Sequence, residues 1–118
     1  MSNPAFEPRS YAKQPELFGK YSVMEWKPIP DGASNTTLDQ ISAAKRQHVL
    51  AMAIREAVMK SATSVRAYAT SRHEIEYSRF AAVLRGEAVM KLDDIAYAER
   101  DLKLVLWNNA DLWRGFRR

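Results

Sequence analysis

The chain has no cysteine, two histidines and four glycines among its 118 residues. Without cysteine it can form no disulfide and no thiolate zinc site, and it has no cysteine nucleophile. Two histidines cannot supply a three-histidine metal site, and the scattered glycines provide no glycine-rich phosphate loop. No nucleophile, base and acid stand out as a catalytic set. We therefore expect neither a metal nor a cofactor, and no enzymatic activity.

Long hydrophobic runs are also missing. The longest candidate, Val49 to Ile54, is far shorter than the roughly 18 apolar residues that a membrane span requires, and it leads directly into Arg55. Residues 1–9 have neither the basic region nor the apolar region of a secretory signal. We therefore expect a cytoplasmic protein with no membrane contact.

The composition that remains is ordinary for one small globular domain, with 47% hydrophobic and 27% charged residues. Eighteen basic and fourteen acidic residues give a formal charge of +4. Residues 60–118 hold eleven of the basic and eight of the acidic residues, so +3 of this charge lies in the second half. This mild local excess permits a nucleic-acid partner without requiring one.

The composition also divides the chain into three parts. Residues 1–35 contain all five prolines and several aromatic residues, which predicts an extended N-terminal arm that packs on the body of the protein or on a partner. Residues 36–102 have the pattern of a compact helical domain, so the expected fold class is all-α. Residues 103–118 form an aromatic and basic C-terminal segment containing Trp107 and Trp113, for which strand and helix both remain open.

The first predicted helix begins after a turn and runs to about Lys60. Thr37 and Gln40 have the spacing of a capping box, with the Thr37 hydroxyl at the N-cap. Residues at helical spacing predict its buried face: Leu38, Ile41, Ala44, His48, Val49, Met52 and Met59. His48 on this face is interpreted as a packed core residue because no second metal-ligating residue accompanies it.

Three short helices follow. Ser64 is a predicted N-cap for a helix over residues 65–70, and a polar turn leads to a second helix over residues 75–85. Gly86 stands where a helix end favours a left-handed residue. Residues 92–102 form the last short helix, with acidic residues at its N-terminal end.

These short helices resemble the helix-turn-helix of the phage-repressor and Cro-like family, over about residues 64–102. The residues that carry the likeness are Ile75, Phe80 and Leu84-Arg85-Gly86 in the second helix, and Leu92, Ile95 and Leu102 as core positions of the third. The chain departs from the family pattern in having a turn one residue longer and Glu74 at the usual turn glycine. The resemblance implies a homodimer that binds double-stranded DNA at paired half-sites and regulates transcription as a repressor.

The same resemblance, together with the distribution of charge, gives the predicted contacts. Base edges would be met by the start of the second helix, about residues 76–85: Glu76, Tyr77, Ser78 and Arg79. The DNA backbone would be met by Ser64, Arg66, Arg72, Arg85 and Lys91. Simpler interpretations stay open, because Glu76 can cap the helix, Tyr77 can be half-buried and Arg79 can pair with a nearby carboxylate.

Two other functions are compatible with the sequence. A protein-interaction adaptor would use the arm and the tryptophan-rich C-terminal segment to bind a partner such as the transcription machinery. An RNA-binding protein would use the aromatic and basic residues of 103–118.

Overall fold

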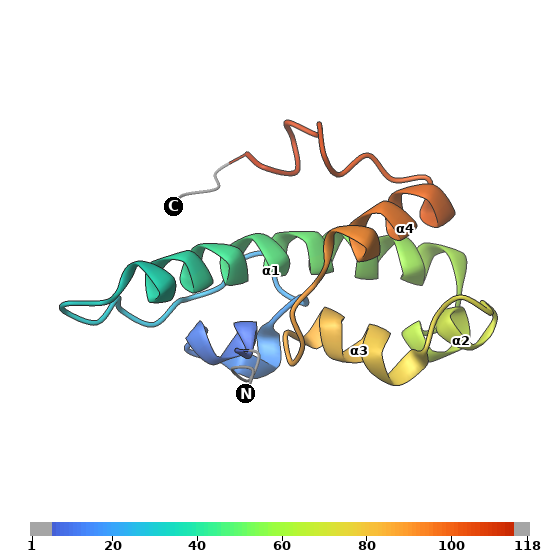
Figure 1. The fold of residues 1–118 in the computed structure, drawn as a ribbon. Coiled ribbons are helices and arrows are strands. Elements are labelled where there is room, and N and C mark those ends of the chain that lie inside the picture. Colours follow the sequence, from blue (N-terminus) through green and yellow to red (C-terminus); the bar gives the residue numbers. More distant parts are fainter. Residues whose placement is uncertain (1–5, 115–118) are drawn as a thin grey trace.

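The computed structural model describes residues 6–114, and this part of the chain is all-α, as predicted (Figure 1). Its elements are the 3-10 helices η1 (Pro8–Tyr11) and η2 (Pro15–Leu17) and the α-helices α1 (Asn35–Ser61), α2 (Val65–Thr70), α3 (Tyr77–Arg85) and α4 (Leu92–Leu102). In Figure 1, α1 crosses the molecule, α2 and α3 lie below it, and α4 runs over its second half. Between residues 6 and 114, no helix has both the length and the apolar composition needed to cross a bilayer.

The long helix α1 begins three residues earlier than a Thr37 cap would allow. Ser34 is the N-cap, and its hydroxyl accepts a hydrogen bond from the Thr37 amide at 3.1 Å. The predicted capping box of Thr37 and Gln40 is therefore wrong. Both hydroxyls suit an N-cap, and the extended backbone of Ser34 places its side chain over the free amides of the first turn.

The buried face of α1 also differs in part from the prediction. Leu38 and Met59 are exposed, whereas the following residues are buried: Ile41, Ala44, Gln47, His48, Leu50, Ala51, Ile54 and Val58. The helix is covered by the N-terminal segment on one side and by the short helices on another, so apolar residues occupy more than one face. A single apolar stripe could not identify the correct register for such a helix.

The N-terminal segment packs directly on α1. Phe18 is 1% exposed and belongs to the same core cluster as Ala51 and Leu84. His48 is buried among the rings of Phe18 and Trp26, at centroid distances of 5.3 and 5.8 Å. Its Nδ1 accepts from the Gly19 amide at 2.8 Å and its Nε2 lies 2.9 Å from the Tyr21 carbonyl, so the interpretation of His48 as a packed core residue is confirmed.

The short helices follow the predicted boundaries closely. The Ser64 hydroxyl caps α2 by accepting from the Ala67 amide at 3.0 Å. Gly86 ends α3 in the left-handed region, with φ of +77°, and α4 has the predicted bounds. The second helix starts at Tyr77 instead of residue 75, because Glu76 takes the N-cap position.

Two predictions near the C-terminus are not met. Leu92, a core position by the resemblance, is 80% exposed, whereas Ile95 and Leu102 do pack against the core. Residues 104–114 are neither strand nor helix, since Lys103 ends α4 with φ of +56° and irregular turns follow. Leu106 nevertheless lies in the core, and the Trp113 indole donates to the Leu106 carbonyl at 3.1 Å.

Candidate nucleic-acid interface

Aromatic packing and a buried hydroxyl fix α2 against α3 and α4. The Tyr68 ring on α2 lies 5.7 Å from the Phe80 ring on α3, and Tyr68 is 2% exposed. Its hydroxyl donates to the Asp101 carboxylate on α4. Burial first, and then this hydrogen bond and the charge of Asp101, raise the pKa of Tyr68 well above its usual value. The three short helices therefore share one core contact.

The turn between α2 and α3 is tied to α4 by two ion pairs. Arg72 Nε lies 2.9 Å from Asp101 Oδ2, and its guanidinium also stacks over the Tyr68 ring at 4.7 Å. Arg100 lies 2.9 Å from Glu74. These contacts set the direction in which α3 leaves the turn.

The C-terminal end of α3 is held by Gln47, a buried residue of α1. Its amide nitrogen donates to the Val83 and Ala88 carbonyls at 2.9 and 2.8 Å, and its amide oxygen accepts from the Met90 amide at 2.8 Å. All three bonds satisfy backbone groups around the helix exit, where a helix leaves its last carbonyls unpaired. Sequence reasoning missed this residue because glutamine is usually exposed, and no local pattern marks it.

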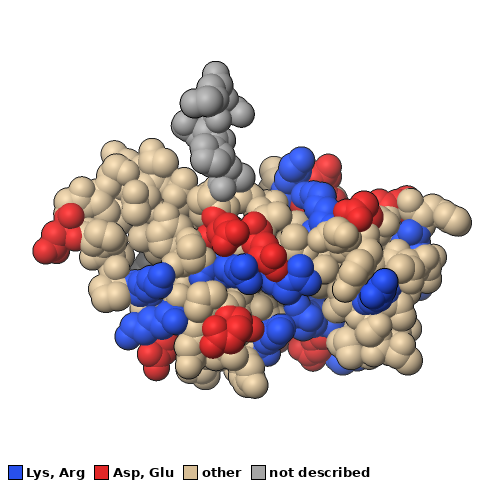
Figure 2. Space-filling model, turned by 90° about the horizontal axis from the view of Figure 1, so that it is seen from below, with Lys and Arg blue, Asp and Glu red and all other residues tan. Residues whose placement is uncertain are grey.

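The outward face of α3 is formed by Ser78, Ala82 and Arg85, with Arg79 at its edge, while Ala81, Val83 and Leu84 face the core. Viewed from the side on which α2 and α3 lie, Lys and Arg side chains gather across the middle of the molecule, with Asp and Glu side chains among them (Figure 2). On this face the small residue Ala82 therefore lies between arginines, Arg79 and Arg85, that are close to carboxylates.

Glu76 caps α3. Its carboxylate accepts from the Arg79 and Ser78 amides at 2.8 and 3.0 Å, and these two bonds hold the pKa of Glu76 below its usual value. The structure therefore gives Glu76 the capping role that the sequence left open, and both of its carboxylate oxygens are occupied.

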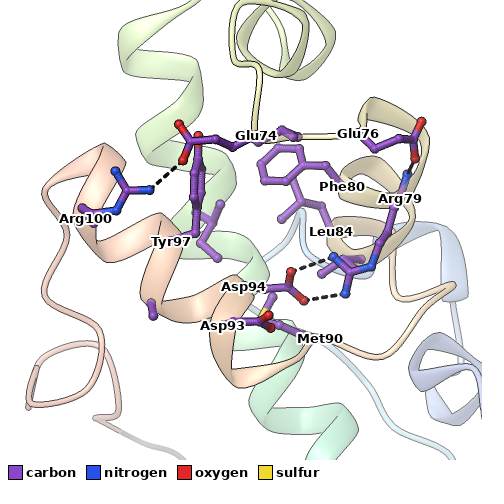
Figure 3. A pocket seen from close by; sticks show the side chains of 14 residues that line it. Glu74, Glu76, Arg79, Phe80, Leu84, Met90, Asp93, Asp94, Tyr97 and Arg100 are labelled. Carbon is purple, nitrogen blue, oxygen red and sulfur yellow. Dashed lines mark hydrogen bonds and ion pairs between the residues drawn. The ribbon is translucent and has the colours of Figure 1, made fainter.

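Arg79 forms a bidentate ion pair with Asp94, the third residue of α4, at 2.6 and 2.8 Å (Figure 3). The hydrogen bond to Asp94 raises the pKa of Arg79. Burial of Asp94 opposes its ionisation, but the bonds from Arg79 and from the Lys91 amide outweigh this and lower the pKa of Asp94. The guanidinium of Arg79 is thus directed toward α4 and not outward from α3.

Tyr77 and Arg66 lie side by side at the start of α3. The Arg66 guanidinium is 5.4 Å from the centroid of the Tyr77 ring, so it connects the start of α2 to the start of α3. Ser78 is exposed beside them, and Ser64 is engaged as the N-cap of α2. Within residues 6–114, neither Arg66 nor Lys91 forms an ion pair, although Arg66 lies over the Tyr77 ring and the charge of Lys91 helps to lower the pKa of Asp94, so a phosphate would not have to displace a carboxylate from either side chain.

Arg72 and Arg85 differ from Arg66 and Lys91, because Arg72 and Arg85 both contact carboxylates. Arg72 is held by Asp101, and Arg85 pairs with Glu87, which also lies 3.8 Å from Arg9. The hydrogen bond from Arg85 lowers the pKa of Glu87. The structure thus brings seven of the nine predicted residues to the starts of α2 and α3 and the loop before α4: Ser64, Arg66, Glu76, Tyr77, Ser78, Arg79 and Lys91.

No group of three or more histidine, aspartate or glutamate residues in the described part of the chain could hold a metal ion. No family model matches this chain, and comparison with the curated proteins and with the solved structures found no match either.

Proposed function

We propose that the protein is a sequence-specific DNA-binding regulator of transcription, acting as a repressor, in which α2, the following turn and α3 form a helix-turn-helix. The observation that carries the proposal is the packing of α3. Its core side is fixed by Tyr68 and Gln47, while Ser78, Ala82 and Arg85 face outward. A major groove admits such a helix when its contact side is small and polar.

Two cations support the same assignment. Arg66 and Lys91 are exposed and form no ion pair within residues 6–114, and they lie at the starts of α2 and α4. Each would contact a phosphate while α3 lies in the groove, and each contact would release condensed counterions. Tyr77 beside Arg66 is suited to stacking on a sugar or on a thymine methyl group.

The test is selection of bound sequences from random double-stranded DNA, followed by anisotropy titrations at several salt concentrations. Arg66→Ala and Lys91→Ala should each weaken binding to all sequences and reduce the salt slope by about 0.9. Lys45→Ala is the matched control because Lys45, on α1, lines a hollow to which Trp26 and Leu112 contribute but no residue of α3 does. Absence of DNA binding by the unmodified protein at low salt would falsify the proposal.

A second candidate function, that of a protein-interaction adaptor, is favoured by one surface. Leu92 and Trp107, 80% and 85% exposed, line a mostly apolar hollow with Ile95, Leu106 and Trp113. Contiguous exposed apolar side chains are typical of contact with another protein, which could also be the second copy in a homodimer. Trp107→Ser separates the two cases: a dimer contact predicts a monomer by sedimentation and weaker binding to palindromic DNA, and an adaptor predicts unchanged DNA binding.

A further inference from the structure

A groove of about 610 Å³ separates α3 from α4 and opens to solvent beside the Arg79–Asp94 pair (Figure 3). Its floor is apolar and includes Phe80, Leu84 and Met90. This volume lies within the range of small-molecule sites, which combine apolar walls with a few polar groups. The groove can therefore bury the apolar part of a small ligand.

The charges around the groove are unequal. Four carboxylates line it, from Glu74, Glu76, Asp93 and Asp94, against two guanidinium groups, from Arg79 and Arg100. Asp93 forms no ion pair with any residue between 6 and 114. Because low-dielectric walls strengthen the field of such an excess, the groove favours an occupant with a positive charge.

A buried hydroxyl without a partner is a separate indication that the groove binds a ligand. Tyr97 projects from α4 into the groove wall, and its Oη is buried without a hydrogen-bond partner in the described part of the chain. A hydroxyl in this state has lost its hydration, so a ligand N–H that reaches it would restore a hydrogen bond. Apolar floor, acidic rim and unpaired hydroxyl together define the chemistry of the occupant.

We infer that this groove binds a small organic ammonium ion with an aromatic or branched apolar body. The apolar body rests on Phe80, Leu84 and Met90, and the ammonium group lies among the carboxylates of the rim, where Asp93 forms no ion pair within the described part of the chain, unlike Glu74 and Asp94. The inference does not depend on DNA binding, since the groove and its charges exist in the isolated chain.

Three probes with the same ring system and different charge test the inference: tryptamine, the neutral alcohol tryptophol and the anion indole-3-acetate. Calorimetry should show tryptamine binding at least about 10-fold more tightly than tryptophol, and indole-3-acetate more weakly than both. Tryptamine should shift backbone amide resonances of residues 74–80 and 90–100 in ¹H–¹⁵N spectra. Equal affinity for the three probes, or shifts confined to other residues, overturns the inference.

Three variants assign the contacts. Asp93→Asn should weaken tryptamine binding by about 3- to 10-fold with little change for tryptophol, while Glu56→Gln on α1, outside the groove, should change neither. Tyr97→Phe should weaken tryptamine binding by about 3-fold while leaving the melting temperature unchanged or higher, because it removes a hydroxyl without a partner. If Asp93→Asn behaves like Glu56→Gln, the charge argument is wrong.

Discussion

The Arg79–Asp94 pair allows a prediction in which stability and DNA affinity change in opposite directions. In the free protein Asp94 holds both terminal nitrogens of Arg79, at 2.6 and 2.8 Å. Asp94→Asn removes the charge that holds Arg79 but keeps a side-chain oxygen that can accept from the Lys91 amide. The substitution should therefore release Arg79 without breaking the start of α4.

The magnitudes follow from exposure and geometry. The two side chains are 42% and 22% exposed, so solvent screens the pair, and its loss should cost about 1 kcal/mol of folding free energy. Loss of a negative charge from the first turn of α4 adds about 0.5 kcal/mol. On DNA, a released Arg79 that contacts one phosphate or guanine should raise affinity about 5- to 10-fold and make the salt slope more negative by about 0.9.

Fluorescence anisotropy with the selected DNA, at four or more salt concentrations, measures both effects, and urea denaturation measures stability. Asp93→Asn is the matched control because it removes the same charge from the same helix turn, while the bidentate pair remains intact. The double variant Arg79→Ala with Asp94→Asn should lose the gain. Tighter binding cannot result from damage to the fold, which would lower affinity.

Two results would refute this reasoning. Equal gains from Asp93→Asn and Asp94→Asn would mean that only the overall charge matters and that Arg79 does not reach DNA. Weaker binding by Asp94→Asn would mean that the ion pair itself orients α3 for binding, and Arg79 would then be a positioning residue instead of a DNA contact.

Other expectations concern the core. Burial lowers the pKa of His48, although its bond to the Tyr21 carbonyl opposes this, so the unfolded chain binds more protons just below pH 6.5 and the free energy of unfolding should decrease there as pH falls. His48→Gln should remove this dependence in urea titrations between pH 5 and 8, and substitution of the exposed His73 should not. Gly86→Ala should cost about 2–3 kcal/mol, because it combines φ of +77° with a Cβ 2.7 Å from the Phe18 ring, whereas Gly32→Ala, with φ of +71° in open space, should cost about 1 kcal/mol; equal costs would show that Phe18 moves aside.

Local sequence signals were sufficient wherever one residue decides the outcome. Ser64 and Gly86 each act on their own backbone neighbours, through an N-cap bond and a left-handed φ, and both were predicted. The bounds of α2 and α4 follow from such signals. The Ser34 cap was missed because two hydroxyls three residues apart satisfy the same local rule, and only the backbone entering the helix selects between them.

The candidate site depends on contacts between distant residues, and these could not be predicted from local patterns. Arg79 and Asp94 are fifteen positions apart, and Gln47 bonds to carbonyls 36 and 41 positions away. Helical periodicity identifies which side of a helix is apolar but does not show which charged residue on another helix comes within reach. The identity of α3 as an exposed short helix was therefore predictable, whereas the engagement of its arginine was not.

The ion pairs formed by the arginines change what the basic second half of the chain, residues 60–118, implies about DNA binding. Its net charge of +3 permits a DNA partner, but Arg72, Arg79 and Arg85 all contact carboxylates. Among the five arginine and lysine residues predicted to contact DNA, only Arg66 and Lys91 can do so without the loss of an ion pair within residues 6–114. Two phosphate contacts per protomer give a salt slope of only about −2, too weak to hold DNA unselectively at physiological salt. Tight binding then requires a sequence that offers Arg79 a better acceptor than Asp94, so the ion pair favours specific over non-specific binding.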